Sequence, residues 1–191
     1  IDVAKKSKSI DRIVVSTDDT EISEIAKKAG AEVPFLRPAE ISKDETPGIE
    51  PALHAIKKLP EFEWLLLLQP TSPLRNIQDI EGIIKFCEEN NSPSAVSISE
   101  VNQHPNHMYH KDDTSHLKPF VKNRKEFTRR QEFTPLYITN GALYLAKTEW
   151  LIKTKSFIGS ETLGFLMPEE RSVDLDTSYD WNLAELALKN N

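Results

Sequence analysis

Two aspartates near the end of the sequence are spaced to act together on one cation. Asp174 and Asp176 flank Leu175 in SVDLDT, and residues 172–176 have the pattern of a short strand. Residues two apart in a strand point to the same side, so both carboxylates can face one metal ion while Leu175 enters the core. Mg²⁺ favours a few carboxylates together with phosphates and water. The alternative is a solvated acidic turn ahead of the last helix.

A second candidate region is the polar loop QPTSPLR, residues 69–75, which follows a run of leucines. Nothing alternates in residues 64–69, which predicts a strand buried on both faces. Pro70 and Pro73 fix φ and withhold N–H donors, so the loop after the strand is stiff. Three side chains of the loop can bind an anion or cap the next helix, and we favour capping: Thr71, Ser72 and Arg75.

Two further patterns have an ordinary structural interpretation. Asn140 and Gly141 follow the apolar stretch PLYIT, and an Asn-Gly pair most often forms a tight turn between two strands. Four histidines within residues 102–134 resemble a metal cluster, but their spacing fits no helix-borne zinc pattern and no cysteine is near. We therefore do not expect zinc at His104, His107, His110 and His116.

The elements that must position these residues alternate along the chain. Apolar runs predict strands, and helical periodicity predicts the segments between them; in residues 76–90, for example, Ile80, Ile83, Ile84 and Cys87 share one face. Alternating strands and helices predict an α/β fold with a mostly parallel, doubly wound sheet, whose ligands bind beyond the carboxyl ends of the strands. The expected strands are residues 12–19, 31–38, 64–69, 94–101, a strand from 140, and 172–176.

Composition limits the classes of protein to which this chain can belong. The 191 residues are 38% hydrophobic and suit a single domain, with residues 102–134 as a polar excursion within it. The net charge of −6 is interspersed and disfavours nucleic-acid binding. The single cysteine, Cys87, fits a reducing cytoplasm, and no apolar run approaches the roughly 20 residues of a membrane helix.

Seven segments together resemble one family, the acylneuraminate cytidylyltransferases, which include the CMP-sialic acid synthetases. They are IDRIVVSTDD, LRPAEIS, DETPGIEPALHAI, LLLLQPTSPLR, HP, RRQEFTPLYITNGALYL and SVDLDTSYDWNLAE. The resemblance implies a Rossmann-like nucleotidyltransferase that activates a nine-carbon α-keto acid sugar with CTP and releases pyrophosphate. It also implies that Asp174 and Asp176 hold Mg²⁺ against the triphosphate.

The resemblance assigns roles to further residues, each beside a structural alternative. Gln69 matches a sugar-binding glutamine but can cap its own loop, and Tyr144 matches a tyrosine of the sugar pocket but can be a core aromatic. Asn140 matches a residue that contacts nucleotide or sugar. Arg130 matches the arginine that binds the sugar carboxylate, with Arg129 as a rival and a solvated charge cluster as the alternative.

Three matches concern the base and the excursion. Arg37 matches an arginine near the cytidine, and its alternative is an ordinary surface charge before a proline. Thr46 matches a small or hydroxyl residue close to the base, and its alternative is a hydroxyl at a helix N-terminus. His104 matches the histidine of an HP pair, and His107 stands where some members have a lysine. The excursion resembles a dimerisation arm that reaches into the partner's active site, which implies a homodimer.

One departure from the family leaves alternatives open. The family opens with a strand and a Gly/Lys/Arg-rich phosphate loop, which this sequence lacks, and we expect the sequence to be an incomplete record of a longer chain. The rival functions are a related nucleotidyltransferase with another sugar or base, and a binding or assembly module without catalysis.

Overall fold

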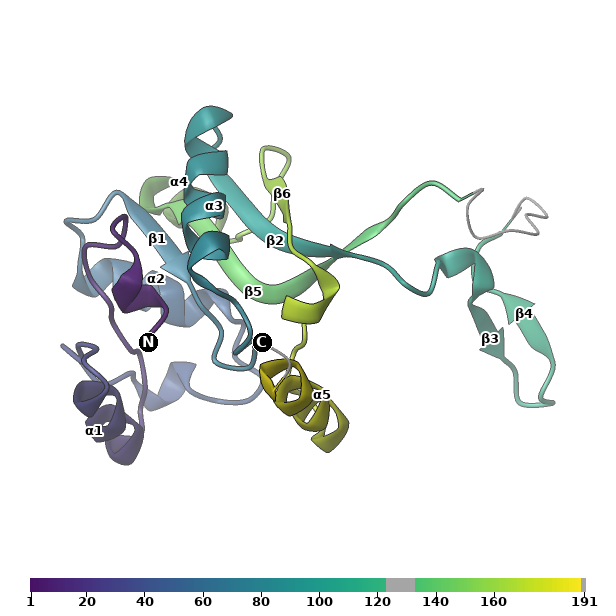
Figure 1. Ribbon diagram of the computed structural model, residues 1–191, viewed down its shortest axis with the longest axis horizontal. Coiled ribbons are helices and arrows are strands. Elements are labelled where there is room, and N and C mark those ends of the chain that lie inside the picture. The colour runs from purple at the N-terminus through teal and green to yellow at the C-terminus, as the bar shows by residue number, and fades with distance from the viewer. Residues whose placement is uncertain (123–132, 190–191) are drawn as a thin grey trace.

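The computed structural model describes residues 1–122 and 133–189, and four strands form its main sheet (Figure 1). Their order is β1 (Trp64–Leu67), β5 (Tyr137–Lys147), β2 (Ser94–Glu100) and β6 (Leu163–Leu166). β2 and β6 are parallel, whereas β5 is antiparallel to both of its neighbours, β1 and β2. The α/β class is confirmed. Three of the four strands share one direction, and the sheet is mixed because β5 runs against them.

Helices cover both faces of this sheet. α3 (Ile77–Glu89) packs on one face, where Ile80, Ile83 and Cys87 meet Leu143 and Leu145 of β5. α2 (Ile49–Lys58) and α4 (Thr148–Thr154) pack on the other, against alternate residues of the same strand. The face of α3 that the sequence predicts is therefore the buried face. The other described α-helices are α1 (Thr20–Lys28) and α5 (Ser178–Lys189), and short 3₁₀ helices lie at Ala4–Lys6, Ala39–Ile41 and Glu169–Arg171.

The two strands expected near the start of the chain are reduced to one pair of residues. Val14 and Glu32 form an isolated parallel bridge, supported by the bond from Val15 N to Glu32 O at 2.9 Å. Pro34 and Pro38 withhold N–H donors shortly after this bridge, which prevents a longer ladder. The expectation of regular strands at residues 12–19 and 31–38 is therefore wrong.

Two other expectations about strands need correction. β1 is half-buried along its whole length, not buried on both faces, because it lies at an edge of the described sheet. Residues 172–176 form no strand; the sixth strand is β6, which the sequence interpretation missed. Gly164 in the middle of this short segment weakens the β pattern that would have revealed it.

The polar excursion leaves the sheet between β2 and β5. Its described part contains a 3₁₀ turn (Pro105–His107) and a small hairpin of β3 (Tyr109–Lys111) and β4 (Leu117–Pro119). Figure 1 shows this hairpin projecting far from the sheet. We call the described part of the excursion, residues 102–122 with 133 and 134, the arm. Within the described residues, no helix has the length and apolar character to cross a bilayer.

Candidate functional site

The centre of the candidate site is an irregularity in β5. The register against β2 shifts so that Val96 faces Tyr144 while Ile98 faces Thr139, and Gly141 lies inside this bulge with φ of +76°. The Asn140–Gly141 pair therefore forms a β-bulge within one strand, and the expected tight turn between two strands is wrong. A bulge bends its strand and redirects side chains, a feature often found beside active sites.

Three segments approach one another at this glycine. A Cβ built on Gly141 would lie 2.8 Å from Gln69 Oε1, 3.1 Å from Asp174 Oδ2 and 3.3 Å from Ser72 Oγ. The loop after β1 and the segment before α5 thus meet at the bulge, although about 100 residues separate them in the sequence. We call this group of oxygens the Gly141 cradle.

Two oxygens of the cradle residues lack hydrogen-bond partners. Ser72 Oγ and Asp174 Oδ1 are both buried and make no hydrogen bond within the described part of the chain. A buried polar atom without a partner costs about 1–3 kcal/mol, so such atoms in a polar cradle indicate a place for a ligand or cation. The carboxylate and hydroxyl oxygens are the hard donors that Mg²⁺ prefers.

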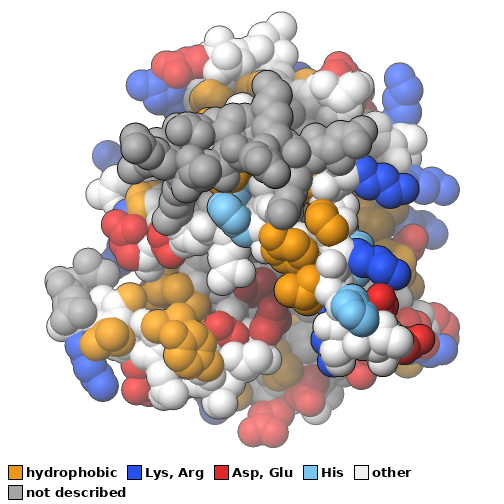
Figure 2. All heavy atoms as spheres, turned by 90° about the vertical axis from the view of Figure 1, so that its right-hand side faces the viewer, with side chains coloured by type: hydrophobic (Ala, Val, Ile, Leu, Met, Phe, Trp, Pro, Cys, Tyr) orange, Lys and Arg blue, Asp and Glu red, His pale blue; other side chains and the backbone are white. Residues whose placement is uncertain are grey.

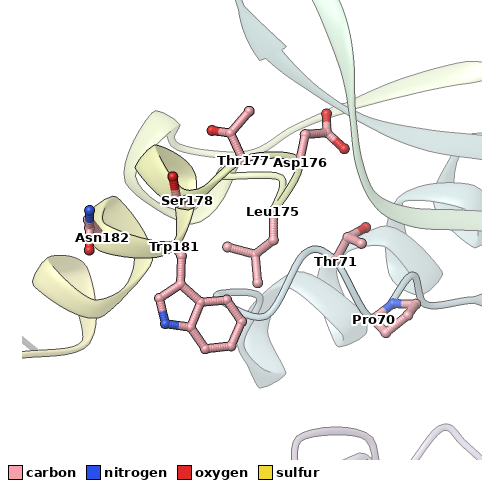
Figure 3. A pocket seen from close by; sticks show the side chains of 8 residues that line it. All are labelled: Pro70, Thr71, Leu175, Asp176, Thr177, Ser178, Trp181 and Asn182. Carbon is pink, nitrogen blue, oxygen red and sulfur yellow. The ribbon is translucent and has the colours of Figure 1, made fainter.

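The aspartate segment, residues 172–176, is irregular and contains one tight three-residue turn, at 174–176. Asp176 N donates to Asp174 O at 3.1 Å, and Leu175 N donates to Thr71 O at 2.8 Å. Leu175 does not enter the core as expected; it lines an open cavity of about 610 Å³ together with Thr71 and Trp181. Figure 3 shows the Leu175 side chain on the Trp181 side of the turn and exposed Asp176 pointing away from it.

The loop of residues 69–75, here the proline loop, is held from within by Arg75. Arg75 Nη1 donates to the carbonyl oxygens of Gln69 (2.8 Å), Ser72 (2.6 Å) and Ala142 (3.3 Å). Burial lowers the pKa of Arg75 to about 10, so the guanidinium stays charged at neutral pH. The Nη1 group therefore binds backbone carbonyls of both the proline loop and β5. Arg75 thereby fixes the distance between Gln69 and the bulge.

The capping role expected for the proline loop belongs to another residue. Asn76 Oδ1 accepts from Asp79 N, and Asp79 Oδ2 accepts from Asn76 N, which is a complete capping box at the start of α3. The interpretation of Thr71, Ser72 and Arg75 as caps is therefore wrong. The hydroxyl of Ser72 is left for the cradle.

Tyr144 and Asn140 lie beside the cradle on β5. The Tyr144 ring contacts Phe157 with centroids 5.4 Å apart, and burial followed by the negative charge of Asp174 raises the pKa of its hydroxyl. Asn140 is only 6% exposed; its Oδ1 accepts from Ser97 Oγ and its Nδ2 donates to Ser172 Oγ at 2.9 Å. The structure thus gives Tyr144 a packing role and proximity to the carboxylate, and it places Asn140 in a buried network.

The residues expected near the base lie in the loops before α2. Arg37 pairs with Asp18 at 3.2 Å and donates to Ser42 Oγ at 2.9 Å. Thr46 is half-buried, and the helix cap that was its alternative role falls on Gly48, which makes no side-chain cap bond. No contact described for Arg37 or Thr46 joins them to the Gly141 cradle.

His104 belongs to the arm. Its ring stacks on Phe133 with centroids 4.5 Å apart, and His107 meets the edge of the same ring at 5.1 Å. Arg129 and Arg130 lie outside the described residues. Figure 2, which faces the end of the molecule that carries the arm, shows acidic side chains gathered in a hollow near the middle of that face.

A metal at the cradle would depend on few protein ligands. Within residues 1–122 and 133–189, no group of three or more His, Cys, Asp or Glu side chains is arranged to hold a metal. Mg²⁺ commonly takes one or two carboxylates and completes its shell with phosphates and water, so Asp174 and Asp176 are ligands of the chemical kind that this ion prefers.

Sequence reasoning names Gln69 and Asp174, which both reach the cradle, but it assigns Gly141 to a turn and favours a capping role for Ser72. It does not identify Ser97 and Ser172, which bond to Asn140 beside the cradle. A glycine inside an apolar strand pattern signals a bulge or a close backbone approach, and that signal was present at Gly141.

Known proteins match almost the whole chain. A sequence model of the cytidylyltransferase family matches residues 1–181. The CMP-N,N'-diacetyllegionaminic acid synthase of Legionella pneumophila subsp. pneumophila (strain Philadelphia 1) is 32% identical, over 98% of this chain and 82% of that protein. The N-acylneuraminate cytidylyltransferase of Escherichia coli O18:K1:H7 is 30% identical, over 96% of this chain and 43% of its own length.

A solved structure agrees on the fold. The CMP:2-keto-3-deoxy-manno-octonic acid synthetase, determined with CTP, superimposes with a TM-score of 0.64 at 14% identity, covering 98% of this chain and 86% of that one. At this identity the likeness concerns the fold alone, and it confirms a nucleotidyltransferase architecture. The chain belongs to the cytidylyltransferase family and is a nucleotidyltransferase enzyme.

Proposed function

We propose that the protein transfers the cytidylyl group of CTP to a nonulosonic acid of the sialic type, giving a CMP-sugar and pyrophosphate. The observation that carries the proposal is the Gly141 cradle, where Asp174 Oδ1 and Ser72 Oγ are buried without partners. The relatives at 30–32% identity, named for legionaminic and acylneuraminic acids, support this class of sugar.

The cradle residues suit a divalent cation, for which Mg²⁺ is our choice. Asp174 would hold it through its unpartnered oxygen, and exposed Asp176 would provide a second carboxylate from the solvent side. When bound, the cation neutralises the charge that develops on the phosphates during phosphoryl transfer. Without it, two carboxylates would repel a triphosphate.

Other residues would position the sugar. Gln69 carries an amide at the carboxyl end of β1, where it can both donate to and accept from sugar hydroxyls. Tyr144 offers a hydroxyl that is protonated at neutral pH, as tyrosine ordinarily is, and that would donate a hydrogen bond to the sugar. Arg130 would bind the sugar carboxylate, with His104 of the arm on the sugar side.

Arg37 and Thr46 would line the base. Arg37 is held by Asp18 and Ser42, which fixes the direction of its guanidinium. The loops that carry both residues precede α2, and no described contact joins them to the Gly141 cradle. Asn140 stands among the residues expected to touch substrate, although its amide is buried.

The reaction has one bond formed and one broken. The anomeric oxygen of the sugar attacks the α-phosphorus of CTP, and the bond from that phosphorus to the oxygen that bridges it to the β-phosphorus breaks. Pyrophosphate carries away the electron pair of that bond, and the proton of the anomeric hydroxyl is released to solvent water. Side chains of the cradle hold the attacking oxygen in line with the leaving group, which is the main contribution a protein makes to this type of transfer.

A second copy of the chain is the partner that we propose. The arm projects from the sheet and exposes apolar side chains, with Leu117 64% and Phe120 54% exposed. Exposed apolar residues on a projecting hairpin are typical of an interface.

The test is turnover by the protein as its gene encodes it. CTP is offered with N-acetylneuraminic, legionaminic and pseudaminic acids and with 3-deoxy-octulosonate, and pyrophosphate release and CMP-sugar formation are followed with and without a chelator. We expect CTP-dependent release with at least one nine-carbon acid and loss of turnover on chelation.

Turnover with 3-deoxy-octulosonate alone, or with a nucleotide other than CTP, would replace the proposed substrates by those of a related enzyme. Absence of turnover with every sugar and nucleotide would favour a binding module.

A further inference from the structure

A chain of hydrogen bonds links β5 and β2 to the aspartate segment. Leu143 N donates to Ser97 Oγ at 2.8 Å, and Ser97 Oγ donates to Asn140 Oδ1. Asn140 Nδ2 donates to Ser172 Oγ at 2.9 Å, and Ser172 Oγ donates to Pro168 O at 2.7 Å. We call Ser97, Asn140 and Ser172 the relay. Each hydroxyl in it both accepts and donates, and Ser97 Oγ has a second, longer acceptor in Leu143 O at 3.2 Å.

The Asn140 amide is almost fully used by this network. Its Oδ1 accepts from Ser97 Oγ and from Ala142 N (3.2 Å), which occupies both lone pairs. One of its two N–H groups is taken by Ser172, and the residue is only 6% exposed. A side chain in this state has little capacity left for a ligand. Its bonds point instead to the loop that carries Asp174.

That loop is fixed on both sides of Ser172. Arg171 donates to both carboxylate oxygens of Asp79 at 2.9 and 2.8 Å, and Leu175 N donates to Thr71 O at 2.8 Å. The relay supplies the one described side-chain link from this loop to the bulge of β5. Asp174 therefore lies between two residues whose positions are fixed by hydrogen bonds, Ser172 and Leu175. Its Oδ2 faces Gly141, and its Oδ1 has no partner among the described residues.

We infer that Asn140 is a positioning residue. It acts through Ser172 to hold the Asp174 carboxylate in its place in the Gly141 cradle, where that carboxylate can bind a divalent cation. The inference rests on the proposed metal site and differs from the direct substrate contact that the family resemblance implies. Hydrogen bonds that orient metal ligands are commonly worth a factor of 10 to 100 in metal affinity.

Ser172→Ala removes the link and leaves the Asn140 amide in place. We expect the affinity of the protein for Mn²⁺ alone, measured by electron paramagnetic resonance, to fall about 10-fold. The Mg²⁺ concentration for half-maximal pyrophosphate release should rise by a similar factor, while the KM for CTP at saturating Mg²⁺ stays near the wild-type value. Ser172→Thr keeps a hydroxyl and should restore both quantities.

Ser156→Ala is the matched control. Ser156 Oγ donates to Ile158 O at 2.8 Å in the loop between α4 and β6, so this variant loses a comparable bond away from the aspartate segment. It should bind Mn²⁺ like the wild type. Thermal melting of every variant establishes that the fold is retained.

A double-variant cycle separates positioning from contact. If Asn140 acts through Ser172, then Asn140→Ala and Ser172→Ala together weaken Mn²⁺ binding no more than the stronger single change. Wild-type Mn²⁺ affinity in Ser172→Ala overturns the inference. So does an increase in KM for CTP or sugar in Asn140→Ala without any change in metal affinity, since that is the signature of direct contact.

The outcome is distinct from that of the proposed function. A wild-type protein that binds Mn²⁺ but activates no nonulosonic acid removes the proposed substrates, and the relay is still judged by the metal affinities of its variants. A wild-type protein that binds no Mn²⁺ overturns the inference together with the metal site.

Discussion

A single residue without a side chain allows the site to form. At Gly141 the backbone has φ of +76°, and oxygens of Gln69, Ser72 and Asp174 lie within 3.3 Å of the position a Cβ would occupy. An L-residue with a side chain pays about 1–2 kcal/mol for left-handed backbone geometry. The same residue would also displace the cradle side chains of Gln69, Ser72 and Asp174.

Gly141→Ala should therefore reduce activity more than stability. We expect about 1–2 kcal/mol less stability in urea unfolding, because Gln69 can swing away from the new methyl group while the backbone strain remains. The rate of CMP-sugar formation should fall by more than the loss of stability accounts for, since the methyl group displaces the side chains of Gln69 and Asp174.

Gly48→Ala is the control for this change. Gly48 has φ of −57° and open space where its Cβ would lie, so stability should stay within about 0.5 kcal/mol of wild type. Wild-type activity in Gly141→Ala would contradict the cradle as the centre of the site.

At the scale of elements, the aspartate segment is held against the start of α3. Asp79 is 3% exposed, closes the capping box with Asn76 and accepts two bonds from Arg171. Removing one partner of such a pair leaves a buried charge without compensation, which costs more than the pair itself contributes. The pair thus couples the helix start to the loop that carries the aspartates.

Arg171→Met should lower the free energy of unfolding by roughly 2 kcal/mol, because Asp79 loses its two charge-assisted bonds. Chemical denaturation measures this loss. Lys85→Met, which breaks an exposed pair with Glu89 on the same helix, should change stability little. An equal decrease in the free energy of unfolding in the two variants would show that the bonds from Arg171 do not stabilise Asp79.

α2 carries a histidine that makes stability depend on pH. His54 Nδ1 is buried without a partner and its ring meets the edge of Phe35 at 4.9 Å. Burial, and then the charges of Lys58, Lys57 and Arg37, lower the pKa of His54 in the folded state. The unfolded chain therefore binds more protons below about pH 6.5, so stability is present above that pH and is lost as the pH falls through the lowered folded pKa.

His54→Leu should remove this part of the acid destabilisation. Urea unfolding at pH 7.5 and pH 5.5 should show a smaller loss between the two conditions in the variant than in the wild type. His116→Gln is the control, because it alters a histidine of the arm whose side chain is 81% exposed and leaves His54 in place. The stability that this variant loses between pH 7.5 and pH 5.5 should equal the loss in the wild type. An unchanged loss in His54→Leu would assign the acid sensitivity to other groups.

Some elements could be predicted from the sequence and others could not, for physical reasons. The buried face of α3 follows from the spacing of Ile80, Ile83 and Cys87, because helix periodicity is a local property. The bulge at Gly141 is not local, since it depends on Ser97 of another strand, which bonds to Asn140 and to Leu143 N. The geometry of the segment that carries Asp174 and Asp176 was not predictable, because its backbone is held by the bond from Leu175 N to Thr71 O and forms no strand.

At the scale of the whole molecule, the helix-covered sheet and the arm have separate tasks. The sheet and its helices contain both clusters of buried apolar residues. The described arm has no buried residue in β3 or β4 and projects beyond the sheet. A second copy of the chain would cover its exposed apolar side chains.

Leu117→Glu should shift the protein from dimer to monomer. Leu117 is 64% exposed on β4, so a charge there disturbs little within one chain but opposes burial against a partner. Sedimentation velocity over a range of concentrations measures the change. Asp113→Asn, in the turn of the same hairpin, should sediment like the wild type. A wild-type protein that is monomeric at all concentrations would contradict the proposed dimer.

The most direct test of the account is turnover by Asp174→Asn. The change keeps the shape of the side chain and removes the charge that we assign to the cation, so CMP-sugar formation should fall by at least about 100-fold, a loss typical of removing a key transition-state interaction. Melting temperature should change little, because Asp174 Oδ1 has no described hydrogen bond to lose. Asp11→Asn, at an exposed aspartate in the segment before α1, serves as the control. An Asp174→Asn protein that makes CMP-sugar at the wild-type rate, with unchanged Mg²⁺ dependence, would contradict the assignment of the Gly141 cradle as the catalytic centre.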